Sequence, residues 1–256
     1  MEFLKFIVYS HTDYLDVLKI QTAGLKFYNN KILLINNNSH NLEDLYKYYN
    51  EVIFYDDTLP YANRLLSLSN LKDKYVLFIH DIDIIVKKDD SILTHIQNFM
   101  DKNSIDRIDL QVRSEWDRSN KDIVKINYND LEIELRKQTN VNNYIYNVNP
   151  SIWKVSSFLD ILNKFRDETY RTIENDSVMN YCRKYNIYKL YSNNPIKCGW
   201  FSCLSFFMFI HITHKGKLLP KTNNQLDVSL IPEYVNIIDK LFKYNTNKKF
   251  FEGSIR

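Results

Sequence analysis

The sequence predicts an α/β fold in which helices flank a mostly parallel β-sheet, with a smaller antiparallel region after it. Two observations predict this class. Over residues 1–100, short continuous apolar runs alternate with segments in which apolar residues recur at helical spacing. A continuous apolar run is typical of a strand buried on both faces, as in a parallel sheet covered by helices. Beyond residue 100, several short strand-like runs follow one another, which favours antiparallel pairing there.

The first part of the chain should contribute four strands, separated by three helices. Helix 14–28 has Leu15, Leu18 and Leu25 on one face, with Thr12 or Asp13 as a candidate N-cap. A proline opens the third helix, as is common in a first helical turn. The expected strands are 3–9, 32–35, 52–55 and 75–80, and the other two helices are 42–49 and 60–71.

The second part is less regular, and no internal repeat or long linker divides it from the first. We therefore expect one domain over residues 1–256, with parts at about 1–100, 101–220 and 221–256. The expected strands are 108–112, 123–126, 131–135, 144–148 and the strand-like stretch 204–214, and the expected helices are 91–100, 155–165, 177–185 and 232–242.

Composition excludes several classes of protein. The chain carries 34 basic and 31 acidic residues, and this even balance argues against a dedicated nucleic-acid binder. Its three cysteines include no CxxC pair, which argues against a disulfide framework or a structural zinc site and indicates a reducing, cytoplasmic compartment. The N-terminus does not resemble a signal peptide. The apolar stretch 200–212 is too short to span a membrane; we expect buried strands there, with a peripheral membrane contact as the alternative.

Polar residues follow each of the four strands expected in the first part. In parallel sheets, ligands bind beyond the carboxyl ends of the strands. The polar segments that follow the strands are Ser10–Asp13, 36–38, Asp56–Asp57 and Asp81–Asp83. The sequence therefore predicts a binding site at this edge of the sheet.

Asp81 and Asp83 carry the most specific chemistry, because they end the apolar run YVLFIHDIDIIV. Carboxylates at positions i and i+2 of an extended strand point the same way, and two such charges resist ionisation unless a cation lies beside them. Mg²⁺ or Mn²⁺ would meet that need and would also bind the phosphates of a nucleoside diphosphate or triphosphate. The alternative is a turn in which one aspartate caps the next element.

Four segments of the chain resemble the GT-A class of glycosyltransferases, whose DXD motif follows a strand of a Rossmann-like, nucleotide-binding half. The resemblance covers about residues 3–220. It implies a metal-dependent hexosyltransferase that takes a nucleotide-sugar donor, with UDP as the expected nucleotide, and a glycan or other hydroxyl acceptor. The four segments are YANRLLSLSNLKDKYVLFIHDIDIIV, NPSIWKVSSFLDIL, IENDSVMNYCRKYNIYKLY and HITHKGKLLP.

The same resemblance implies roles for the acidic residues. Asp83 would bind the metal directly, and Asp81 would bind the ribose or reach the metal through water. The segment IENDSVMNY is similar to the family's acidic motif, which supplies a catalytic base. Asn175 separates Glu174 from Asp176, whereas the family's acidic residues are adjacent, so either carboxylate is a candidate. We favour Asp176, because it stands where a helix begins; N-capping is the alternative role for both.

The segment HITHKGKLLP resembles the family's C-terminal histidine loop, which closes over the metal and the diphosphate. His214 and His211 are both candidate metal ligands, and His214 is favoured because it lies nearer the expected loop. Lys217 or its neighbour Lys215 could neutralise the leaving diphosphate. A strand end with solvated lysines is the alternative.

Other candidates carry less specific signals. Ser10, Thr12 and Asp56 stand at strand ends and are candidates for donor binding, with Asp57 as the alternative to Asp56. Arg64 could pair with donor phosphate or with Asp81, or could face solvent. Trp116 could stack on the acceptor sugar or could pack in the core.

Two other functions remain open on the sequence alone. One is a DxD-type phosphohydrolase with an aspartyl nucleophile, although such folds begin with the DxD strand and three strands precede it here. The other is a nucleotide- or glycan-binding module with little or no turnover.

Overall fold

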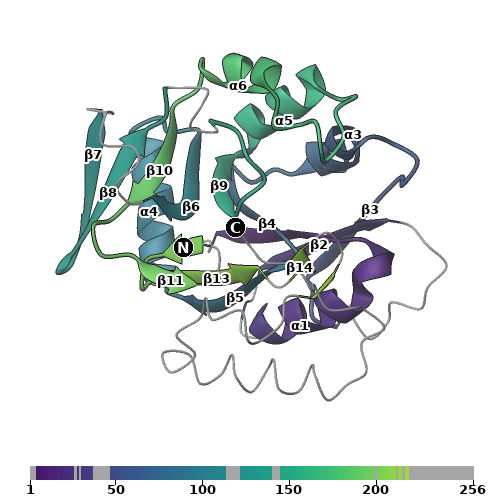
Figure 1. Ribbon diagram of the computed structural model, residues 1–256, viewed down its shortest axis with the longest axis horizontal. Helices are drawn as coiled ribbons and strands as arrows, with labels where there is room; N and C mark the ends of the chain where they lie inside the picture. The colour runs from purple at the N-terminus through teal and green to yellow at the C-terminus, as the bar shows by residue number, and fades with distance from the viewer. Residues whose placement is uncertain are drawn as a thin grey trace.

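The computed structural model describes residues 4–25, 28, 30–36, 47–113, 122–139, 145–198, 201–211, 213–214 and 217–218. Its central element is a nine-stranded sheet with the order β3-β2-β1-β4-β9-β6-β10-β8-β7 (Figure 1). The strands are β1 (Lys5–Tyr9), β2 (Lys31–Asn36), β3 (Glu51–Tyr55), β4 (Tyr75–His80), β6 (Arg107–Arg113), β7 (Ile123–Tyr128), β8 (Leu131–Lys137), β9 (Ser151–Lys154) and β10 (Ile187–Tyr191).

The first four strands are parallel to one another, as predicted. Alternate residues of β1, β2 and β4 enter cores on opposite faces of the sheet; in β2, Leu33 and Ile35 face one core and Ile32 and Leu34 the other. The order 3-2-1-4 is that of a doubly wound fold, in which the direction of winding reverses between β1 and β4. Ligands of such sheets bind at this switch point.

The other half of the sheet is mixed. Strand β9 is antiparallel to both β4 and β6, β10 is parallel to β6, and β8 and β7 are antiparallel to their neighbours. These pairings confirm the predicted α/β class with an antiparallel region. Because β6 runs in the same direction as β4, its carboxyl end lies at the same edge of the sheet as the carboxyl ends of β1–β4.

Two layers cover the sheet (Figure 1). Helices α3, α5 and α6 lie on one face, and α1, α4 and the β5–β13 strand pair lie on the other. The helices are α1 (Leu15–Leu25), α3 (Tyr61–Leu65), α4 (Asp90–Lys102), α5 (Val155–Lys164) and α6 (Asp176–Cys182), and the two strands are β5 (Asp83–Lys88) and β13 (Phe207–His211).

Several predicted elements differ in the structure. The helix expected over 60–71 divides into α3 and a 3-10 helix, Leu66–Asn70. The expected strand 144–148 is wrong for its described residues, because 145, 146 and 148 are bends and 147 has no regular structure. A strand that was not predicted, β9, follows them. Of the expected helix 42–49, only 47–49 are described, and they do not form a helix; the expected helix 232–242 lies outside the described residues.

The strand that carries the aspartates also ends earlier than its apolar run suggests. A turn at Asp81–Ile82 separates β4 from β5, and Asp83 is the first residue of β5. Asp81 therefore lies in a turn and Asp83 directly after it, so the two aspartates do not share one extended strand.

The three cysteines, Cys182, Cys198 and Cys203, are buried and free. None of the helices that the structure describes has both the length and the apolar character needed to cross a bilayer.

Candidate functional site

Ser10 and Asp81 meet at the switch point of the sheet. Ser10 directly follows β1, Asp81 directly follows β4, and the Ser10 hydroxyl donates to Oδ2 of Asp81 at 2.6 Å. The backbone repeats the link, because the Asp81 amide donates to the Tyr9 carbonyl at 2.9 Å. From β3, the Tyr55 hydroxyl donates to the Ser10 carbonyl at 2.8 Å. Two predicted site residues are thus held together where this type of sheet binds ligands.

Asp83 lies directly beyond the turn, and α1 fixes its position. The side chain of Gln21 is buried; its Nε2 donates to the Asp83 carbonyl at 2.6 Å, and its Oε1 accepts from the Ile85 amide at 3.3 Å. One amide side chain on α1 thereby satisfies two backbone groups of β5. The hydrogen bonds from Ser10 to Asp81 and from Gln21 to Asp83 therefore hold the chain on both sides of Ile82.

His211 is brought to Asp83 by strand pairing. The two residues are paired in the β5–β13 ladder, and Nδ1 of His211 donates to Oδ1 of Asp83 at 2.9 Å. Both side chains are largely buried. The structure thus brings two of the predicted metal ligands, Asp83 and His211, into direct contact.

Carboxylate oxygen and imidazole nitrogen are donor types that suit Mn²⁺ or Mg²⁺. No three His, Cys, Asp or Glu side chains among the described residues lie close enough together to hold an ion by themselves. A magnesium-type site does not need such a cage, because nucleotide-bound ions are held by one or two carboxylates, waters and the substrate's phosphates. The donor set around Asp83 fits that second kind of site.

Thr12 and Asn36 form a reciprocal pair beside Ser10. The Thr12 amide donates to Oδ1 of Asn36 at 2.8 Å, and Nδ2 of Asn36 donates to Oγ1 of Thr12 at 3.0 Å. Both side chains are buried. The pair links the carboxyl ends of β1 and β2, so the side chain of Thr12 has a structural role beside Ser10.

Arg64, Asp57 and His11 form a separate cluster, so the aspartate that pairs with Arg64 is Asp57 and not Asp81. Arg64 pairs with Asp57, through Nη1 and Oδ1 at 2.9 Å, and His11 donates to the other carboxylate oxygen at 2.8 Å. Asp56 is exposed and accepts from the amide and the hydroxyl of Thr58. Those hydrogen bonds lower the pKa of Asp56. Asp57, the alternative to Asp56, is therefore the residue that meets Arg64.

His80 connects the end of β4 to the segment 145–150. It is buried, and burial lowers its pKa to about 4, so the ring is neutral at pH 7. Its Nδ1 lies 3.1 Å from the carbonyl of Val148, which can only accept, so Nδ1 carries the proton. Its Nε2 then accepts from the Tyr61 hydroxyl at 2.8 Å.

Glu174 and Asp176 have opposite surroundings. Asp176 is exposed in the first turn of α6, whose N-cap is Asn175, with its side chain accepting from the Val178 amide. Glu174 is half-buried, and its Oε1 accepts from the Val148 amide at 2.8 Å. Burial raises the pKa of Glu174. Val148 therefore links Glu174 through its amide to His80 through its carbonyl.

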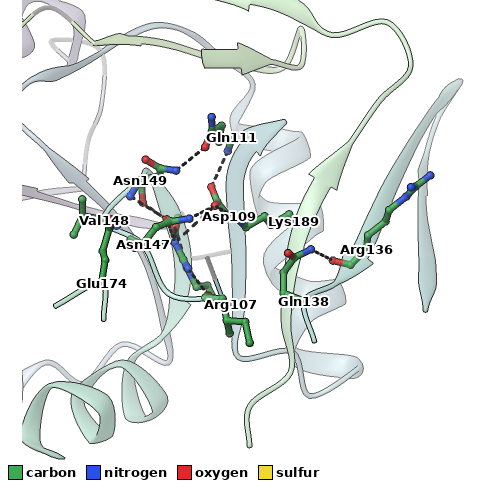
Figure 2. Close-up of polar contacts among 12 residues, drawn as sticks. Arg107, Asp109, Gln111, Arg136, Gln138, Asn147, Val148, Asn149, Glu174 and Lys189 are labelled. Carbon is green, nitrogen blue, oxygen red and sulfur yellow. Dashed lines mark hydrogen bonds and ion pairs between the residues drawn. The ribbon is translucent and has the colours of Figure 1, made fainter. Parts of the chain in front are cut away.

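A buried polar network holds the segment that contains Val148 (Figure 2). Arg107 donates to the carbonyls of Ile145 and Asn147, at 2.9 and 3.0 Å, and Nδ2 of Asn147 donates to Asp109 at 2.7 Å. Lys189 lies 3.6 Å from the same carboxylate oxygen of Asp109. Burial opposes the ionisation of Asp109, but the charges of Lys189 and Arg107 outweigh it and lower the pKa of Asp109.

Three predicted site residues cannot be placed by side chain. Trp116 lies outside the described residues. For His214 and Lys217 only the backbone is described: they are paired across the hairpin of β14 (Thr213–His214) and β15 (Lys217–Leu218). This hairpin follows β13 closely, so its backbone begins two residues after His211.

Sequence reasoning missed Gln21, Arg107 and Tyr170. Arg107, Asp109 and Gln111 stand at alternate positions of one strand, and that alternation was a readable sign of a polar face. No local pattern in the sequence indicates that Gln21, on α1, forms hydrogen bonds with the backbone of β5. Nor does any pattern single out Tyr170 among the 19 tyrosines of the chain.

Neither a protein-family model nor a curated protein sequence matches the chain. Among solved structures, the chain is similar to residues 1–349 of TarS from S. aureus, with 13% identity, a TM-score of 0.43, and coverage of 75% of this chain and 60% of that one. It is also similar to apo UDP-glucose pyrophosphorylase, with 11% identity, a TM-score of 0.42, and coverage of 73% and 90%. A third similar structure is the glycosyltransferase GlyE from Streptococcus pneumoniae TIGR4, with 9% identity, a TM-score of 0.46, and coverage of 99% and 67%.

Proposed function

We propose that the protein is a glycosyltransferase that moves a sugar from a UDP-sugar to a hydroxyl acceptor. One observation carries the proposal. Ser10 and Asp81 are hydrogen-bonded at 2.6 Å at the switch point of a doubly wound sheet, and Asp83, two residues after Asp81, is hydrogen-bonded to His211. The switch point is where such sheets bind nucleotides. Two carboxylates there favour a ligand that arrives with a divalent cation.

Asp83 and His211 would hold that cation, with Asp81 beside them. A bound Mn²⁺ or Mg²⁺ would offset the negative charge of the diphosphate as the sugar leaves it. Water and diphosphate oxygens would complete its coordination, which is the usual arrangement for these ions at nucleotides. Ser10 holds Oδ2 of Asp81, so the hydroxyl fixes the orientation of that carboxylate.

The acceptor hydroxyl must lose a proton, and Glu174 suits that role better than Asp176. A carboxylate with a raised pKa is a stronger base, and burial raises the pKa of Glu174. The Val148 amide orients its carboxylate at 2.8 Å. Asp176 instead lies in solvent at the start of α6. We assign the base of an inverting transfer to Glu174.

The β14–β15 hairpin supports a role for His214 and Lys217 at the diphosphate. Their paired backbone positions follow the strand that delivers His211 to Asp83. An imidazole and an ammonium group at this place would add a metal ligand and a positive charge for the leaving diphosphate.

The test is UDP release from a panel of UDP-hexoses and UDP-N-acetylhexosamines, with Mn²⁺ and with a chelator. We expect release that depends on the metal and that falls by at least about a hundredfold in Asp83→Asn. Asp101→Asn is the matched control, because Asp101 is exposed and pairs with Lys74 near the start of β4, at the opposite edge of the sheet. Metal-independent release, or full activity of Asp83→Asn, would overturn the proposal.

A further inference from the structure

Tyr170 presents an exposed aromatic ring beside the site. Tyr170 is 45% exposed, whereas Tyr61 and His80, which support it, are buried. The ring centroid of Tyr170 lies 5.3 Å from that of Tyr61 and 5.5 Å from that of His80, both in edge-to-face geometry. Because His80 directly precedes Asp81, this ring is fixed next to the end of β4.

Burial and nearby carboxylates both act on the phenol of Tyr170. Its pKa is raised, first by burial and then by the charges of Asp83, Glu174 and Asp81. The phenol therefore lies within electrostatic reach of both groups of carboxylates, although Tyr170 is 45% exposed.

An amide pair lies farther along the same edge of the sheet. Ser151 is paired with Phe78 of β4 and with Asp109 of β6, so Asn149, two residues earlier, is level with His80 on one side and Gln111 on the other. Nδ2 of Asn149 donates to Oε1 of Gln111 at 2.6 Å. The pair thus lies near the carboxyl end of β6, on the side of Asp81 that faces away from β1.

This amide pair offers one acceptor and one donor to a ligand. Both side chains are half-buried, and no hydrogen-bond partner for Oδ1 of Asn149 or Nε2 of Gln111 occurs within the described part of the chain. A hydroxyl group both donates and accepts, so it can satisfy the two atoms together. A ligand with hydroxyl groups matches this arrangement.

The buried network beneath the pair makes it rigid (Figure 2). The Asn149 amide donates to Oδ1 of Asn147, which Arg107 also contacts, and the Gln111 amide donates to Asp109 at 3.0 Å. Groups that are fixed before a ligand arrives lose little conformational entropy when it binds. These residues are therefore built as a preorganised surface.

We propose that Tyr170 and the Asn149–Gln111 pair form the acceptor subsite, and that this subsite selects a pyranose ring. The inference rests on the proposed glycosyl transfer. The exposed ring would cover the apolar C–H face of the sugar, and the amide pair would bind ring hydroxyls. Glu174, which is held by the amide of Val148 next to Asn149, would take the proton of the acceptor hydroxyl. A flexible acceptor without a ring would leave the aromatic face unused.

The test is saturation-transfer NMR on the full chain with methyl glycosides of glucose, galactose and N-acetylglucosamine, and with sorbitol as a ligand without a ring. We expect at least one glycoside to bind, with transfer strongest at its axial C–H protons, and sorbitol not to bind. Tyr170→Leu should weaken that glycoside about fivefold to tenfold, and Tyr170→Phe should retain most of the affinity. Tyr48→Leu is the matched control, because Tyr48 is exposed and precedes β3 at the opposite edge.

Asn149→Ala is the second variant and carries the test if circular dichroism shows that Tyr170→Leu does not fold. It should also weaken the glycoside severalfold. Absence of glycoside binding, equal binding of sorbitol, or wild-type affinity in Tyr170→Leu or Asn149→Ala would overturn the inference. A wild type that binds a glycoside but neither binds UDP nor releases it from any donor would instead overturn the proposed function.

Discussion

At the scale of single residues, hydrogen bonds orient the three carboxylates of the site. The Ser10 hydroxyl orients Asp81, the His211 imidazole meets Asp83, and the Val148 amide holds Glu174. A hydrogen bond to a charged group contributes more than one between neutral groups. Single substitutions should therefore separate the roles of these side chains.

The assignment of the base gives a first prediction. Glu174→Gln keeps the size and the acceptor oxygen of the side chain but cannot take a proton, so transfer should fall by about a hundredfold or more. Steady-state kcat with donor and acceptor saturating is the measurement. A comparable loss in Asp176→Asn, with Glu174→Gln active, would show that the carboxylate at the helix start is the base.

His80 gives a prediction for the dependence of stability on pH. Its pKa is lowered from 6.5 to about 4 by burial, so the unfolded chain binds this proton at a higher pH than the native chain does. The free energy of unfolding should therefore fall as pH drops from about 6.5 to about 4, with ~3 kcal/mol of that loss due to His80.

Urea unfolding between pH 4.5 and 7.5, without added metal, measures this effect in the wild type and in His80→Gln. The variant lacks the titrating ring, so its stability should decline less over this range. Parallel curves for the two proteins would contradict the assignment of a neutral, buried His80.

At the scale of elements, the turn between β4 and β5 depends on α1. Gln21 supplies the hydrogen bonds of the Asp83 carbonyl and the Ile85 amide from a fully buried position. Gln21→Leu should lower the free energy of unfolding by ~1–3 kcal/mol, because both backbone groups lose a buried partner. It should also weaken Mn²⁺-dependent UDP binding.

Gln97→Leu on α4 is the matched control for chemical denaturation. Its Oε1 is buried and has no hydrogen-bond partner among the described residues, so its loss should cost far less than that of Gln21. Equal destabilisation by the two substitutions would show that the brace from Gln21 contributes little.

The segment 145–150 shows where sequence patterns fail at this scale. Its apolar residues predicted a strand. In the structure, Arg107 donates hydrogen bonds to the carbonyls of Ile145 and Asn147, and the chain is bent there. These two hydrogen bonds span 38 and 40 positions of the sequence, so local propensity could not predict them. Strand β5 was missed for a different reason: apolar residues continue on both sides of the turn at Asp81, so periodicity shows no boundary.

At the scale of the whole molecule, the parallel half of the sheet was predictable and the assembly of the site was only partly so. Continuous apolar runs are a local signal, and they predicted β1–β4 together with the polar residues at their ends. The placement of Ser10 against Asp81 follows from that topology. The meeting of Asp83 with His211, and of Tyr170 with His80, depends on long-range pairing and packing that spacing does not encode.

The central claim is that the switch point between β1 and β4 binds a nucleoside diphosphate together with a divalent cation. Calorimetric titration of UDP into the wild type and Asp83→Asn, each with Mn²⁺ and with a chelator, tests it most directly. The account predicts that Mn²⁺ raises the affinity of the wild type for UDP by about tenfold or more, and that Asp83→Asn loses this gain. UDP affinity that is the same with and without Mn²⁺, or a gain that survives in Asp83→Asn, would contradict it.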